Sequence, residues 1–283
     1  MYTEDSKEIY VVDLGMQKNV FYDPRFIKDI NEHFLKNSND LLTIFDPIYG
    51  YDIEDFKHLN SIPVKNVNFA SVEEEDVHKI VNQLTKVSHL GLEDCGALDF
   101  SSFTNLKSLG YTWYKNTIGL DKMTTLERLS ISKLNTKNKN LEYLRKLTEL
   151  KELNIFQSTL TSLIGIEDLK LKKLMLAHLP KLENLNSFKG NMNVETLDIT
   201  NCKGLDVNLL PKCFPNVKNL TIENQGEIAT IEPLLKELAK LEKISVAGKT
   251  KIEDIKSNSF YTEYLEGKKY YIKDLGVSSD WKN

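Results

Sequence analysis

The residue types that could carry chemistry are few and widely separated in this chain. None of the five histidines stands in a spacing that a metal site or a catalytic motif requires. They are His33, His58, His78, His89 and His178. No GxSxG elbow and no glycine-rich phosphate loop occurs. We therefore expect no catalytic residue, no metal and no cofactor, while a triad assembled from distant positions stays open as the alternative.

The cysteines and one acidic run are the other candidates for chemistry. Cys95, Cys202 and Cys213 lack the close pairing of a metal knuckle or a redox motif. The acidic run from Glu73 to Asp76 could bind Ca²⁺ or Mg²⁺. However, Ser71 and Glu74 in the same stretch have capping-box spacing, and helical apolar periodicity follows. The pattern favours a helix start over a cation site.

Composition limits the partners that the protein can have. The chain has 283 residues, 41% of them apolar, which is enough for a full core. No apolar run approaches the roughly 20 residues of a membrane span, and acids stand where a secretory signal would be basic and then apolar. We expect a cytoplasmic protein that binds no membrane. Of 37 basic residues only Arg25, Arg128 and Arg145 are arginine, so nucleic acid is not the expected partner.

An internal repeat organises the middle of the chain. The repeated unit has apolar residues at its first, fourth and sixth positions, and successive units begin 19 to 24 residues apart. The nine matches are VKNVNF from Val64, VSHLGL from Val87, LKSLGY from Leu106, LERLSI from Leu126, LKELNI from Leu150, LKKLML from Leu171, VETLDI from Val194, VKNLTI from Val217 and LEKISV from Leu241. Such a period indicates stacked units that share one core.

This pattern resembles the leucine-rich repeat family, and loosely the bacterial internalins, whose repeat has about 22 residues. The resemblance implies an α/β solenoid in which a curved parallel sheet forms a horseshoe. We expect an N-terminal α/β cap over residues 1–63, about nine repeats over 64–250 and a C-terminal cap over 251–283. Within each strand, alternation predicts that Leu153 and Ile155 face the core. The returning stretch should add Leu160, Leu163, Ile166 and Leu169 to that core.

The ninth position of the repeat departs from the family pattern, which has asparagine there. It holds Val72, Cys95, Tyr114, Leu134, Ser158, Leu179, Cys202, Gln225 and Lys249. Cysteine is the usual replacement, because a small, weakly polar group tolerates burial. We therefore interpret Cys95 and Cys202 as structural residues, with a reactive role as the alternative. Irregular turns are expected in the other units.

The two ends of the chain are predicted to cap the repeats. Near the N-terminus, IYVVDL from Ile9 and LLTIFD from Leu41 are predicted strands that flank a helix, which begins with Asp23 as N-cap and Pro24. Near the C-terminus, FYTEYLEGKKYYIKDL alternates around Glu266 and Gly267, which is typical of a β-hairpin. Such a hairpin would cover the last strand, with a separate binding site as the alternative.

The concave face of the sheet is the expected binding surface. By alternation it is mostly small and polar, but Trp113, Phe156 and Met175 are large and apolar, as interface anchors are. Any of these three could instead pack against a neighbouring strand. The acidic groups on or beside this face could steer a basic partner. They are Glu93, Asp94, Asp198 and Glu223. The full set of expected contact residues is Glu93, Asp94, Trp113, Arg128, Phe156, Met175, His178, Asp198 and Glu223.

The function that the resemblance implies is non-catalytic protein–protein interaction through this concave face. A lysine-rich, arginine-poor composition favours a bacterial source, where an immunity or regulatory protein would fit. One alternative is an enzyme or effector in which the repeats present a substrate. Another is a cell-surface adhesion protein, although the chain ends in SSDWKN without a wall-anchor motif.

Overall fold

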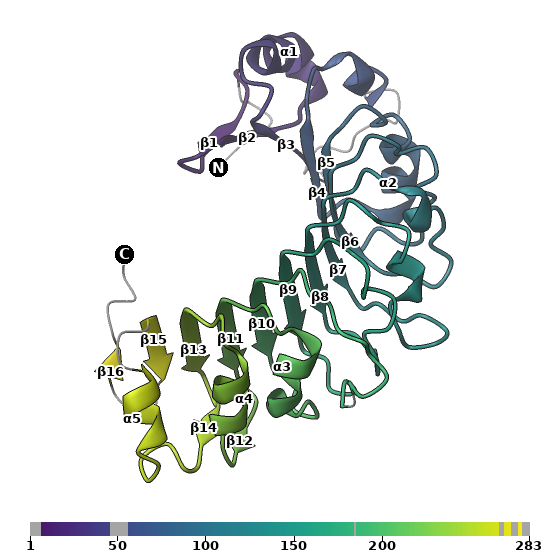
Figure 1. The fold of residues 1–283 in the computed structure, drawn as a ribbon. Helices are drawn as coiled ribbons and strands as arrows, with labels where there is room; N and C mark the ends of the chain where they lie inside the picture. Colours follow the sequence, from purple (N-terminus) through teal and green to yellow (C-terminus); the bar gives the residue numbers. More distant parts are fainter. Residues whose placement is uncertain (1–6, 46–55, 184, 266–268, 273–276, 279–283) are drawn as a thin grey trace. The chain divides into compact units, whose positions relative to one another are not determined.

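The structure is a computed structural model, and it describes residues 7–45, 56–183, 185–265, 269–272 and 277–278. Its chain forms two compact units, residues 1–129 and residues 130–283. Strand β7 (Arg128–Ser132) contains the boundary between them. Figure 1 shows both units as sheets whose strands follow one another in chain order.

The first unit is a sheet whose strands run parallel after an antiparallel start. Strand β1 pairs antiparallel with β2, and β2, β3, β4, β5 and β6 then pair in parallel, each with the next. The strands are β1 (Val11–Asp13), β2 (Lys18–Phe21), β3 (Leu41–Phe45), β4 (Asn66–Ala70), β5 (His89–Leu92) and β6 (Ser108–Thr112). The parallel sheet therefore begins before the first sequence repeat.

The second unit continues the same construction. Strands β8, β9, β10, β11, β13 and β15 pair in parallel, and β16 pairs antiparallel with β15. Their bounds are β8 (Glu152–Phe156), β9 (Lys173–Ala177), β10 (Thr196–Thr200), β11 (Asn219–Glu223), β13 (Lys243–Ala247), β15 (Lys269–Ile272) and β16 (Val277–Ser278). Two short strands of the return segments, β12 (Glu227–Ile228) and β14 (Lys251–Ile252), also pair in parallel.

The predicted register of the repeats is confirmed. All nine sequence matches contain a strand, from β4 to β13, that starts at the third residue of the match. The fourth-position residues Leu129, Leu153, Leu174 and Leu197 are at most 1% exposed. They align across neighbouring strands, as with Leu153, Leu174 and Leu197 in β8, β9 and β10. Each repeat therefore buries its apolar side chains in a core that it shares with its neighbours.

Return segments complete this core with short helices and irregular turns. The predicted inward residues Leu160, Leu163, Ile166 and Leu169 are all buried. In the first unit the helices are η1 (Pro24–Phe26), α1 (Ile27–Lys36), η3 (Leu59–Ser61), α2 (Glu74–Val81) and η4 (Leu120–Lys122). In the second they are η5 (Glu142–Leu144), η6 (Val207–Leu209), α3 (Leu210–Cys213), α4 (Glu232–Glu237) and α5 (Phe260–Leu265).

The N-terminal helix begins as predicted. Asp23 is 2% exposed, and its carboxylate accepts a hydrogen bond from the backbone N–H of Arg25 at 2.9 Å. Ile30 and Phe34 then bury the inner side of α1. The acidic run also begins a helix, α2, but the expected capping box is absent. Ser71 has a φ of +53°, and Glu73 is the N-cap without a side-chain hydrogen bond.

The predicted C-terminal hairpin is wrong in its first arm, which is helix α5. Tyr261 and Leu265 are both buried and lie four residues apart, which is helical spacing. The Tyr261 hydroxyl donates to the Asp254 carboxylate at 2.8 Å, and this bond ties the helix to the last return segment. An antiparallel pair does occur further along, between β15 and β16. Glu266 and Gly267 lie outside the described residues.

Candidate binding surface

The open face of the second unit presents three straight rows of side chains. Because its strands are parallel and in register, outward residues at the same repeat position are neighbours across the sheet. The middle row is Asn154, Met175, Asp198, Thr221 and Ser245. The other two rows are Glu152, Lys173, Thr196, Asn219 and Lys243, and then Phe156, Ala177, Thr200, Glu223 and Ala247. We call these fifteen positions the second-unit face.

The two predicted apolar anchors of this face lie on adjacent strands. Phe156 is paired with Ala177, and Met175 is paired with Asn154 on one side and Asp198 on the other. Phe156 and Met175 are therefore diagonal neighbours, a relation in which long side chains can touch. Both are half-buried. The small methyl group of Ala177 leaves one side of the Phe156 ring less covered than a larger neighbour would.

The charged residues of the second-unit face differ in their pairing. The Lys173 ammonium lies 3.7 Å from an Asp198 carboxylate oxygen, which forms a partly exposed ion pair. Such a pair adds less than about 1 kcal/mol to stability. Among the described residues, the half-buried carboxylate of Glu223 has no ion-pair partner. Glu152, in another row of this face, is also half-buried without such a partner in the described part of the chain, so both glutamates are placed to meet a basic partner.

Predicted contact residues Asp94 and His178 belong to a row with left-handed backbone. At the eighth repeat position, just beyond each strand, φ lies between +45° and +67° in eight of the nine repeats. This left-handed row is Ser71, Asp94, Lys133, Gln157, His178, Asn201, Asn224 and Gly248. In the second unit the backbone N–H of this residue donates to the last carbonyl of the next strand, as from His178 to Thr200 at 2.8 Å. The His178 Nδ1 accepts from the Asn201 amide at 2.8 Å.

The remaining predicted contact residues lie in the first unit. Glu93 and Asp94 are exposed just past the end of β5, and Trp113 is half-buried directly after β6. Arg128 opens β7, and its Nη2 donates to the Nε2 of His89 at 2.6 Å. Phe156, Met175, His178, Asp198 and Glu223 all lie in the second unit. The structure therefore places the predicted site residues in two sets, one in each unit.

The contact with Arg128 fixes the state of His89. A guanidinium can only donate, so the Nε2 of His89 must be an acceptor and the ring must be neutral, with its proton on Nδ1. Burial, and then the charge of Arg128, lower the pKa of His89. The buried Nδ1 has no hydrogen-bond partner among the described residues. His89 is therefore an uncharged donor in the first unit.

An aromatic cluster in the N-terminal cap was not predicted. The rings of Tyr10 and Phe21 have centroids 5.0 Å apart, and those of Phe21 and Phe45 are 5.3 Å apart and nearly perpendicular. Tyr10 is 37% exposed and the other two rings are half-buried. The sequence signal was present, because Phe21 and Phe45 alternate with the core residues Val20 and Ile44 and so must face outward.

The cysteines have structural surroundings. Cys95, Cys202 and Cys213 are buried free thiols, and burial raises the pKa of Cys95 to about 12 and that of Cys202 to about 11. Around Cys202 the asparagine of the family pattern is replaced by hydrogen bonds between neighbouring repeats. The Gln225 side chain accepts from the Cys202 N–H at 2.6 Å and donates to its carbonyl at 3.2 Å. The Gln225 N–H donates to Thr250 at 3.0 Å.

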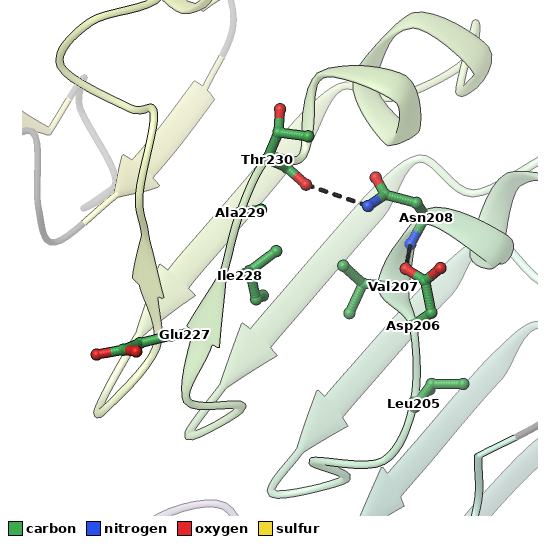
Figure 2. A pocket seen from close by; sticks show the side chains of 8 residues that line it. All are labelled: Leu205, Asp206, Val207, Asn208, Glu227, Ile228, Ala229 and Thr230. Carbon is green, nitrogen blue, oxygen red and sulfur yellow. Dashed lines mark hydrogen bonds between the residues drawn. The ribbon is translucent and has the colours of Figure 1, made fainter.

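No metal site stands out in the described part of the chain. No three His, Cys, Asp or Glu side chains gather there as metal ligands would. A small pocket lies between two return segments of the second unit (Figure 2). Its polar groups stabilise the fold, since Asn208 donates to the Thr230 carbonyl at 3.1 Å and Asp206 accepts from the Asn208 N–H at 3.0 Å. No described helix has the length and apolar character of a membrane span.

Comparison with solved structures confirms the leucine-rich repeat fold. The functional domain of InlJ from Listeria monocytogenes, which includes a cysteine ladder, has a TM-score of 0.52 and 17% identity over 83% of this chain. The internalin InlF from the same organism has a TM-score of 0.53 and 16% identity over 90% of this chain. The chain spans 50% of the InlJ structure and 77% of the InlF structure. No protein-family model and no curated protein matches the sequence.

Proposed function

We propose that the protein is a non-catalytic interaction module that binds another protein through the open face of its repeat sheet. The observation that carries this proposal is the second-unit face, where one side of every strand is buried and the other holds an ordered array of side chains. Aromatic and methionine side chains are frequent interface anchors, and unpaired charges at the margin select and steer a partner. Phe156, Met175 and Glu223 supply these two kinds of group.

Cross-linking from defined positions tests this proposal. A photo-reactive amino acid is placed at Thr221, in the middle row, or at Glu237, an exposed residue of α4 on the return side. Irradiation in cells of the native host should join one protein species to the Thr221 variant and not to the Glu237 variant. Equal cross-linking from both positions, or none from either, would contradict binding through the open face.

We further propose that the partner is met in a bacterial cytoplasm and that the role is immunity or regulation. The chain is lysine-rich and arginine-poor, its three cysteines are unpaired, and the similar InlJ and InlF structures come from a bacterium. If a toxin is encoded beside this gene, co-expression should protect cells, and the Phe156→Ala variant should protect them less. Protection that needs no physical contact would count against an immunity role.

A further inference from the structure

The open face of the first unit differs from the second-unit face in one respect: strands β1 to β6 present no ionised side chain on it, and the exposed Arg128 at the start of β7 lies at its border. Its outward positions, from the residue before β1 to the end of β6, hold aromatic, aliphatic, amide, hydroxyl and glycine residues. They are Tyr10, Val12, Asn19, Phe21, Leu41, Thr43, Phe45, Asn66, Asn68, Ala70, His89, Gly91, Ser108, Gly110 and Thr112. His89, the titratable imidazole among them, is held neutral by Arg128. We call these positions the first-unit face.

In one part of this face two neighbouring strands each have a glycine at an outward position. Gly91 and Gly110 are paired in register on β5 and β6, and neither has a positive φ. A Cβ added to Gly110 would meet only the Cα of Gly91, at 3.8 Å, so the fold has room for a side chain there. The Asn68 amide lies over Gly91, with its oxygen 2.2 Å from the position of an added Cβ. Its amide has no hydrogen-bond partner among the described residues.

The other part of the face is apolar. Tyr10, Phe21 and Phe45 form the aromatic cluster, and the tip of the β1–β2 hairpin adds Leu14 and Met16, which are 54% and 102% exposed. The rings at one end of this hairpin and the exposed leucine and methionine at its turn are groups that contact sites often contain. The cluster's rings are tilted or perpendicular to one another and so do not form one flat stack.

We infer that the first-unit face binds an uncharged peptide segment of the partner protein, with one aromatic or large aliphatic side chain against the aromatic cluster and its backbone over Gly110, beside the Asn68 amide that covers Gly91. This inference rests on the proposed function and names the chemistry of the partner. A cationic side chain would lose its hydration on this face without gaining an opposite charge, and the Arg128 guanidinium that an acidic one could meet already donates to His89. The free Asn68 amide can pair with a peptide group, and the apolar rings of the cluster can pack against an aromatic or large aliphatic side chain.

A random peptide library displayed on phage provides the probe. We expect the peptides enriched on the full chain to lack Asp, Glu, Lys and Arg in their shared segment and to contain an aromatic or large aliphatic residue. Gly110→Leu should weaken binding of the synthesised peptides about tenfold or more, because the leucine side chain occupies the space above Gly110 that the peptide backbone needs. Glu237→Leu, which adds a leucine on the exposed return side of the second unit, should leave affinity unchanged, and melting curves verify that both variants fold. Tyr10→Ala provides a second, independent disruption.

Several results would overturn the inference. These are charged peptides as the enriched class, no enrichment at all, affinity that is the same in the Gly110→Leu variant, or Gly110-dependent binding of neutral oligosaccharides instead of peptides. Affinity that falls steeply with added salt would also contradict an uncharged contact. If the peptides fail while cross-linking from Thr221 succeeds, only this inference falls and the proposed function stands. If both experiments fail, the proposed function falls as well.

Discussion

The two units of this protein have the same inward side and different outward sides. In both, the fourth and sixth repeat positions are buried apolar residues, such as Leu90 and Leu92 in the first unit and Leu153 and Ile155 in the second. Outward, the strands of the first-unit face present no ionised side chain, whereas the second-unit face contains Glu152, Lys173, Asp198, Glu223 and Lys243. The repeat therefore dictates the core and leaves the outward side free to differ, which is where binding chemistry resides.

The largest expected effect comes from exchanging the two sides of one strand. Leu153→Asp should abolish folding, a loss of more than about 4 kcal/mol, because it buries an unpaired carboxylate in the shared core. Glu152→Asp, one residue earlier on the outward side of the same strand, should change stability by less than about 0.5 kcal/mol. Denaturant unfolding followed by circular dichroism measures both. Similar losses for both variants would break the distinction between inward and outward sides.

Two glycines sharpen the comparison, because one is required by the backbone and the other is not. Gly165 in the second unit has a φ of +116°, and an added Cβ would lie 2.3 Å from the carbonyl carbon of Leu141. Gly165→Ala should therefore cost at least about 1 to 3 kcal/mol of stability. Gly110→Ala in the first-unit face should cost less than about 0.5 kcal/mol. If thermal unfolding shows that Gly110→Ala is the more damaging change, that glycine serves the fold rather than a ligand.

A binding measurement addresses the second-unit face. Phe156→Ala should weaken affinity for the cross-linked partner by about 1 to 3 kcal/mol if the ring is an anchor, while the half-buried position limits the loss of stability. Asn219→Ala, on the far row of the same face, is the matched control and should have a smaller effect. Titration calorimetry of each variant with the purified partner measures these affinities. An unchanged affinity for Phe156→Ala would remove that residue from the site.

The smallest expected effect is a pH dependence confined to the first unit. The pKa of His89 in the folded protein lies below the 6.5 of an unperturbed histidine, so the unfolded chain binds the proton more readily. Stability that is present above pH 6.5 should therefore decrease as the pH falls through the folded pKa. The decrease should be smaller in a His89→Gln variant, and unfolding curves across this pH range measure the difference. Parallel pH profiles for the two proteins would show that His89 is not held neutral.

The repeats could be predicted from the sequence because the buried apolar residues recur at fixed positions in every unit. A strand alternates sides at every residue, so three apolar positions such as Leu150, Leu153 and Ile155 determine which residues face the core. The start of every repeat strand followed from this rule, and so did the inward residues of the return segment from Leu160 to Leu169. Binding roles of Phe156 and Met175 stay predictions, since outward placement alone does not identify a contact.

The caps were harder to predict because no repeated pattern constrains them. The stretch FYTEYL alternates in sequence, but its buried pair Tyr261 and Leu265 has helical spacing, and the contact of Tyr261 with Asp254 is not visible in a sequence. Strand β2 and the aromatic cluster around Phe21 were likewise not predicted, because they precede the first repeat and no apolar period identifies their residues as part of the sheet. Tertiary contacts outweighed the local pattern in both places.

The left-handed row also affects which mutations the margin of the sheet can accept over time. Asparagine, aspartate and glycine adopt a positive φ easily, whereas valine, isoleucine and threonine do so at considerable cost. At Lys133 and Gln157, therefore, the backbone itself would reject β-branched replacements before any partner was lost. A β-branched residue in this row would therefore destabilise the fold whether or not it affected a partner. A mutant library that varies these positions should omit valine, isoleucine and threonine codons.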